Sequence, residues 1–114
     1  MSVTIWHNPR CSKSRQTLAL LDEHNIKASI RTYLNSPPTA DEIRAVADLL
    51  GGGVVEMVRT GERLFRDLGL TANSDDQTLI AAMAQNPILI ERPIVIANGK
   101  AAIGRPPAAV LEIL

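Results

Sequence analysis

Apolar residues recur along the chain in two patterns: short runs typical of strands, and three- or four-residue spacing typical of helices. Val3–Trp6 is a short, mostly apolar run and predicts a first strand. A turn at residues 7–10 separates it from a stretch in which Leu18–Leu21 has helical spacing. Residues 28–34 alternate sufficiently to predict a second strand, which ends at the turn residues 35–38. These elements together predict a βαβ unit.

The middle of the chain carries signals for helix starts. Thr39 and Glu42 have the spacing of a capping box ahead of apolar positions at helical spacing. Ser74 and Gln77 repeat that spacing ahead of a second such stretch. Two further short helices are expected between them, at residues 54–59 and 62–68.

The last part of the chain has the pattern of a hairpin followed by a helix. Asn98-Gly99 separates the runs Ile94–Ala97 and Lys100–Ile103 and suits a type I′ turn, because both residues tolerate positive φ. Pro106-Pro107 then opens a final helix. The order predicts an α/β, thioredoxin-like fold, with a helical insertion between an N-terminal βαβ part and a C-terminal ββα part.

Composition limits the classes of function. With 114 residues, 46% apolar and 21% charged, the chain has the makings of one folded domain. Twelve basic and twelve acidic residues balance, so nucleic acid is not an expected partner. Apolar runs are too short for a membrane span and the start lacks a signal-peptide pattern, so we expect a soluble, cytoplasmic protein without a membrane partner.

The single cysteine, Cys11, lies where the first strand gives way to the first helix. Its sulfur is expected to face the unpaired N–H groups at the helix start, with the cations Arg10, Lys13 and Arg15 nearby. Such surroundings favour a thiolate and can also hold an oxyanion. A buried structural cysteine is the alternative, and the polar neighbours argue against it. No second ligand at metal spacing accompanies His7 or His24, so no metal site is expected.

Four segments of the chain resemble one known family. They are His7-Asn8-Pro9-Arg10-Cys11-Ser12-Lys13-Ser14-Arg15, Val58-Arg59, Asn86-Pro87-Ile88-Leu89-Ile90-Glu91-Arg92-Pro93-Ile94-Val95 and Gly104-Arg105-Pro106-Pro107. The chain is similar in these segments to the glutaredoxin-coupled arsenate reductase family, in a branch with charged residues beside the nucleophile. The similarity runs over nearly the whole chain, as a single arsenate reductase-like domain at residues 1–114.

The resemblance implies roles for particular residues. Cys11 would be the nucleophile, and Arg59, Arg92 and Arg105 would hold the oxyanion, with Ser14 and Arg15 supporting the anion-binding loop. Guanidinium groups suit this task because they stay charged and donate paired hydrogen bonds to a tetrahedral anion. The thioredoxin-like resemblance also implies a cis Arg92-Pro93 bond, with Pro93 facing Cys11. Other arginines (Arg31, Arg44, Arg63 and Arg66) are expected on solvated faces.

The implied reaction is reduction of arsenate or a similar oxyanion to arsenite. A second sulfur must resolve the cysteine adduct, and the chain has none. The resolving thiol must therefore come from outside the chain, and the resemblance implies glutathione as co-substrate and a glutaredoxin as partner, with no bound cofactor. Two alternatives remain open on the residues. One is a non-catalytic regulator resembling Spx-type proteins; the other is a monothiol glutaredoxin-like oxidoreductase using Cys11 and Ser14.

Overall fold

The structure is a computed structural model that describes residues 2–114. The chain divides into two compact units. The first, here called the sheet unit, comprises residues 2–36 and 92–114; the second, the helical unit, comprises Pro37–Glu91. The helical unit is therefore inserted into the chain between the two parts of the sheet unit.

The sheet unit contains four strands in the order β2-β1-β3-β4. Their bounds are Val3–Trp6 for β1, Ser29–Arg31 for β2, Ile94–Ala97 for β3 and Lys100–Ile103 for β4. β1 pairs with β2 in parallel and with β3 antiparallel, and β3 and β4 form an antiparallel hairpin. β1 and β2 are parallel, so their connection needs a crossover, and the helix α1 (Ser12–Glu23) supplies it.

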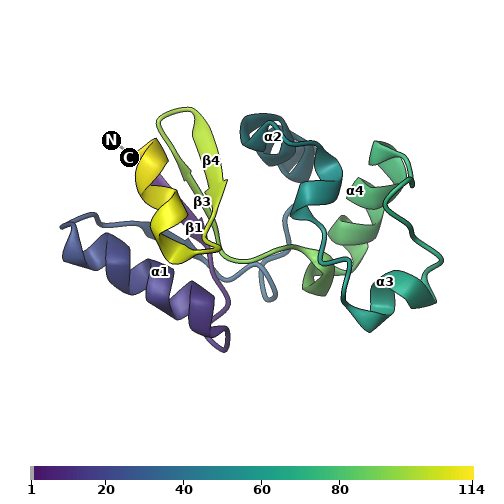
Figure 1. Ribbon diagram of the computed structural model, residues 1–114, viewed down its shortest axis with the longest axis horizontal. Helices are drawn as coiled ribbons and strands as arrows, with labels where there is room; N and C mark the ends of the chain where they lie inside the picture. Colours follow the sequence, from purple (N-terminus) through teal and green to yellow (C-terminus); the bar gives the residue numbers. More distant parts are fainter. Residues whose placement is uncertain (1) are drawn as a thin grey trace. The chain divides into compact units, whose positions relative to one another are not determined.

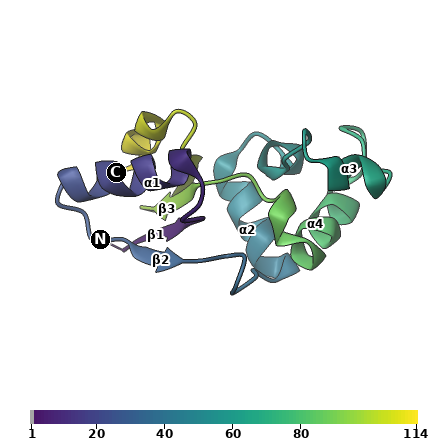
Figure 2. The same ribbon diagram turned by 90° about the horizontal axis from the view of Figure 1, so that it is seen from below.

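Two helices lie on one face of this sheet (Figure 1). They are α1 and the C-terminal 3₁₀ helix η3 (Pro107–Ile113). The core between helices and sheet follows the period-two alternation of the strands, with Val3 and Ile5 of β1 inward. Leu21 of α1 and Val110 of η3 are fully buried against them. Figure 2 shows β2 beside β1 on the far side from β3.

Three strands have the limits that the sequence predicts, and the second is shorter than predicted. The hairpin turn has Asn98 at φ 56° and Gly99 at φ 70°, which confirms the expected turn geometry. β2 covers Ser29–Arg31 rather than residues 28–34, because the chain turns immediately afterwards. The N–H groups of Asn35 and Ser36 both donate to the carbonyl of Thr32.

The helical unit consists of three α-helices and two 3₁₀ turns. They are α2 (Ala40–Leu50), η1 (Val54–Met57), α3 (Arg63–Asp67), α4 (Asp76–Gln85) and η2 (Pro87–Leu89). α2 packs on α4, and both contact η1. Ile43, Met57, Leu79, Met83 and Leu89 are fully buried. An isolated bridge joins Val58, near the middle of the unit's sequence, to Ile90 near its C-terminal end.

The helix ends confirm one predicted cap and correct another. Thr39 and Glu42 form the reciprocal capping box of α2. The predicted box at Ser74 and Gln77 is wrong: Asp75 caps α4 and accepts from the N–H of Thr78, while Ser74 Oγ accepts from Thr71. The predicted helices at 54–59 and 62–68 shrink to η1 and α3, and the final helix is 3₁₀ rather than α.

Candidate functional site

Cys11 is the N-cap residue of α1, with extended backbone angles of φ −90° and ψ 124°. Its N–H donates to the carbonyl of Asn8 at 3.0 Å, and its carbonyl accepts from the N–H of Arg15 at 3.0 Å. The residue is 8% exposed, so the sulfur is buried to a greater degree than the polar neighbouring sequence suggests. The side chains around it are nevertheless polar, as the arginine contacts below show.

The surroundings of Cys11 lower the pKa of its thiol. Burial acts in the opposite direction and is the largest single influence, because it disfavours the charged form. The backbone N–H of Ser14, the guanidinium of Arg92 and the backbone N–H of Lys13 outweigh it together. The expectation that helix N–H groups face the sulfur thus holds for residues 13 and 14, although the sulfur makes no capping hydrogen bond of standard geometry.

Two of the three predicted arginines lie at Cys11. Nη2 of Arg105 is 3.8 Å from Sγ of Cys11. Nε of Arg105 donates to the carbonyl of Arg92 at 2.9 Å, so the two arginines are linked. Arg92 is half-buried, with Nε and Nη1 shielded from solvent. Because Arg92 precedes β3 and Arg105 follows β4, the β3-β4 hairpin brings both to the start of α1.

The approach of the hairpin to α1 requires glycine at position 104. A Cβ there would fall 2.5 Å from Oγ1 of Thr17 and 2.7 Å from Cγ of Pro93. The N–H of Gly104 donates to the carbonyl of Pro93, whose bond to Arg92 is cis as expected; Arg105-Pro106 is cis as well. Thr17 is fully buried and donates to the carbonyl of Lys13. Gly104 lies in one of the four similar segments, where no role is predicted for it, and Thr17 lies outside all four.

Arg59, the third predicted arginine, belongs to the helical unit. Its Nη1 pairs with Oε2 of Glu62 at 2.9 Å, and its side chain is 26% exposed. Its backbone N–H donates to the carbonyl of Leu89, which continues the Val58–Ile90 bridge. The side chain therefore has a neutralising carboxylate within its own unit.

A network of three side chains fixes the loop before α1. Oγ of the fully buried Ser14 lies 2.7 Å from Nδ1 of His7 and accepts from the N–H of Asn8. Asn8 also accepts from the N–H of Arg10 through Oδ1 and from the N–H of Cys11 through its carbonyl. Asn8 was not predicted as a site residue. The turn preference of an Asn before Pro is the sequence signal for it.

The loop cations differ from the expectation. Arg10 and Lys13 are exposed, and the cation that lowers the pKa of Cys11 is Arg92, from a distant part of the sequence. Arg15 donates from Nη1 to the carbonyl of Pro9, so it braces the loop. Arg31, expected on a solvated face, is half-buried, and its guanidinium carbon lies 5.7 Å from the centroid of the Trp6 ring.

The side chain of His7 is buried. Burial lowers its pKa, and the positive charge of Arg15 acts in the same direction. Within residues 2–114 there is no cluster of three or more potential metal ligands, and no helix is long and apolar enough to cross a membrane.

This combination of a sheet with an inserted helical unit and a cysteine facing paired arginines defines a family. The chain belongs to the ArsC family, whose model matches residues 6–113. The α/β, thioredoxin-like fold expected from the sequence is thereby confirmed, together with the family resemblance.

Individual relatives are similar over their full length. The Escherichia coli (strain K12) protein YfgD, described as uncharacterized, is 49% identical, covering 98% of this chain and 96% of the relative. A Haemophilus influenzae protein named arsenate reductase is 47% identical over 100% of both chains. The structure of arsenate reductase from Vibrio cholerae matches with a TM-score of 0.96 at 49% identity, over 100% of this chain and 98% of the other.

Proposed function

We propose that the protein reduces arsenate to arsenite, with Cys11 as the nucleophile. The observation that carries this proposal is the surroundings of the Cys11 sulfur. It has a pKa lowered by Ser14 and Arg92, and Nη2 of Arg105 lies 3.8 Å away. A lowered pKa increases the thiolate fraction, and the thiolate is the reactive form. Relatives named arsenate reductase support this choice of substrate.

The oxyanion is held by donors that already surround the sulfur. Arg92 and Arg105 supply fixed positive charge, and the N–H groups at the start of α1 add partial positive charge. Arg59 is the third arginine of the proposal and would exchange its contact with Glu62 for the substrate. The site thus selects a small tetrahedral anion on charge and on bidentate geometry.

The chemistry proceeds in two balanced steps. The Cys11 thiolate attacks arsenic(V), a sulfur–arsenic bond forms, and one arsenate oxygen leaves as water after taking up protons. A glutathione thiolate then attacks the Cys11 sulfur, a disulfide forms, and the electron pair of the breaking sulfur–arsenic bond reduces arsenic to the trivalent state. Arsenite leaves, and the protein retains a mixed disulfide between Cys11 and glutathione.

The second thiol must come from outside the chain. Cys11 is the one cysteine in the sequence, and Ser14 cannot replace a resolving sulfur because a hydroxyl does not form disulfides. In the proposed reaction this external thiol is glutathione, the co-substrate, and a glutaredoxin regenerates the Cys11 thiol by removing the bound glutathione. The reaction needs no resident cofactor. Its demand for reduced thiols suits the cytoplasm.

The experiment is arsenite formation by the purified protein with glutathione and a glutaredoxin, compared with Cys11→Ser. Wild type is expected to turn over and Cys11→Ser to be inactive. Arsenite formation by Cys11→Ser at the wild-type rate would refute the proposal. Glutathione-linked thiol exchange without any arsenate reduction would favour the monothiol glutaredoxin-like alternative instead.

A further inference from the structure

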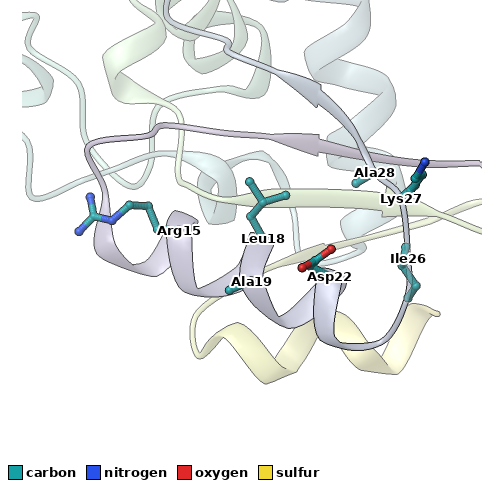
Figure 3. A pocket seen from close by; sticks show the side chains of 7 residues that line it. All are labelled: Arg15, Leu18, Ala19, Asp22, Ile26, Lys27 and Ala28. Carbon is teal, nitrogen blue, oxygen red and sulfur yellow. The ribbon is translucent and has the colours of Figure 1, made fainter.

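A groove of about 580 Å³ runs along one side of α1, within the sheet unit. Figure 3 shows Arg15 at its start and Lys27 at its other end, with Leu18, Ala19 and Asp22 between them. Ile26 and Ala28 complete the lining, and together with Leu18 they are half-buried against the core. The groove therefore has an apolar floor and a cation at either end.

The groove begins at the Cys11 loop. Arg15 lines it, and the same guanidinium donates to the carbonyl of Pro9, two residues before Cys11. Arg15 is four residues from Cys11, or about 6 Å at the rise of an α-helix, and Asp22 is about 16 Å away on the same basis. A surface that covers Cys11 and the groove together is thus no larger than an ordinary protein contact, which takes about 800 Å² from each partner.

The surface carries an excess of positive charge and of apolar area. Residues 10–28 contain the cations Arg10, Lys13, Arg15 and Lys27 and the acids Asp22 and Glu23, giving +2 in a chain whose net charge is zero. Arg10, Lys13 and Lys27 are exposed. Ile30 of β2, two residues beyond Ala28 and on the same sheet face, is 53% exposed. A complementary partner is acidic and presents an apolar side chain.

We propose that this groove is the docking surface for the protein thiol that regenerates Cys11, an acidic partner of the glutaredoxin class. The inference rests on the proposed function, in which Cys11 ends in a mixed disulfide with glutathione. The partner thiolate attacks the glutathione sulfur, a new disulfide forms between partner and glutathione, and Cys11 leaves as a thiolate. Because the partner sulfur must reach an adduct on Cys11, the partner surface is centred close to the start of the groove.

Deglutathionylation of the purified full-length protein tests this inference. The mixed disulfide between Cys11 and glutathione is prepared by treating the protein with oxidised glutathione, without arsenate. A glutaredoxin or dithiothreitol is then added, and removal of the glutathione is followed by intact-protein mass spectrometry. Ala19→Trp fills the groove from an exposed position. It should lower kcat/KM for glutaredoxin at least tenfold and leave the dithiothreitol rate unchanged. Lys27→Glu should lower kcat/KM several-fold at low salt and less at high salt, because salt screens the attraction.

The matched control is Gln16→Trp, which adds the same side chain at another exposed position of α1 that does not line the groove. Gln16 is nearer to Cys11 in sequence than Ala19, so nonspecific crowding would affect it more. Wild-type kinetics for Gln16→Trp together with a slow Ala19→Trp support the docking surface. Equal effects of the two, no effect of either, or failure of glutaredoxin to act on the wild-type disulfide overturn it. Failure of arsenate reduction alone would reject the proposed function. The deglutathionylation test would still be interpretable, because it contains no arsenate.

Discussion

The thiol of Cys11 is subject to opposing influences on its pKa. Burial favours the neutral thiol, whereas the N–H of Ser14 and the charge of Arg92 favour the thiolate, and the net direction is down. Alkylation by iodoacetamide should therefore rise with pH around a midpoint below the value of a free thiol, which is about 8.5. Arg92→Ala should move the midpoint upward. A wild-type midpoint at or above that of free cysteine would contradict the proposed activation.

The two arginines at Cys11 are expected to contribute to turnover. Arg92→Ala or Arg105→Ala should each lower turnover by roughly one to two decades, because a charge-assisted contact contributes about 1.5–3 kcal/mol. Lysine should rescue only in part, since it lacks the bidentate fork. Steady-state kinetics with varied arsenate provides the measurement, and thermal melting checks that the variants remain folded. Wild-type activity in both alanine variants would misplace the anion site.

Local sequence was sufficient to predict Cys11 at a helix start, but it did not predict which cation acts on it. Arg10 and Lys13 are neighbours in sequence, yet their side chains are exposed. Arg92 reaches the sulfur because the β3-β4 hairpin closes onto α1 through Gly104. Only the family motif, not charge spacing, identified Arg92 and Arg105 in advance. The pairing of Cys11 with Arg92 depends on tertiary contacts, which the spacing of charges along the chain does not reveal.

Helix α4 begins beside two neighbouring residues that could act as its N-cap, Ser74 and Asp75, and in the structure the N-cap is Asp75. Hydrogen bonds from Thr78 lower the pKa of Asp75 in the folded protein. The stabilisation from this carboxylate cap is therefore fully present above the pKa of Asp in the unfolded chain, which is about 4. It is lost as the pH falls through the lower pKa of the folded state. Asp75→Ala should lower the urea midpoint at pH 7 more than Ser74→Ala does, and the difference should shrink in acid. Equal midpoints at pH 7 would contradict capping by Asp75.

The elements themselves were predictable to different degrees. β1, β3, β4 and the Thr39 capping box depend on local patterns and match the prediction. β2 is shorter because a turn at Thr32 competes with the alternation of residues 28–34. At the α4 start, Ser and Asp are adjacent and both are good caps, so sequence alone favours neither strongly. The 3₁₀ form of η3 likewise has no distinct sequence signature.

At the scale of the whole molecule, the proposed arginines are divided between two units. Arg92 and Arg105 belong to the sheet unit, and Arg59 belongs to the helical unit, where Glu62 neutralises it. Arg59→Ala should lower turnover by roughly one to two decades, as for the other arginines, because a charge-assisted contact to substrate is lost. It should leave the alkylation midpoint of Cys11 at the wild-type value.

Arg63→Ala is the matched control for that prediction. Arg63 lies in the same unit, is 86% exposed and pairs with Asp67 at 3.6 Å, so its loss should change neither quantity. A wild-type rate for Arg59→Ala would remove Arg59 from the proposed site. Equal loss of activity in Arg59→Ala and Arg63→Ala would indicate a general effect of charge on the helical unit.

The count of one cysteine in the whole molecule leads to the most direct test of the central claim. The protein is incubated with arsenate and glutathione, without glutaredoxin, and its intact mass is recorded. A single glutathione adduct should accumulate in wild type, together with at most one arsenite per adduct, and should be absent in Cys11→Ser. Two results would contradict the account. One is the absence of a glutathione adduct in wild type, and the other is sustained arsenate reduction with thioredoxin as the sole reductant.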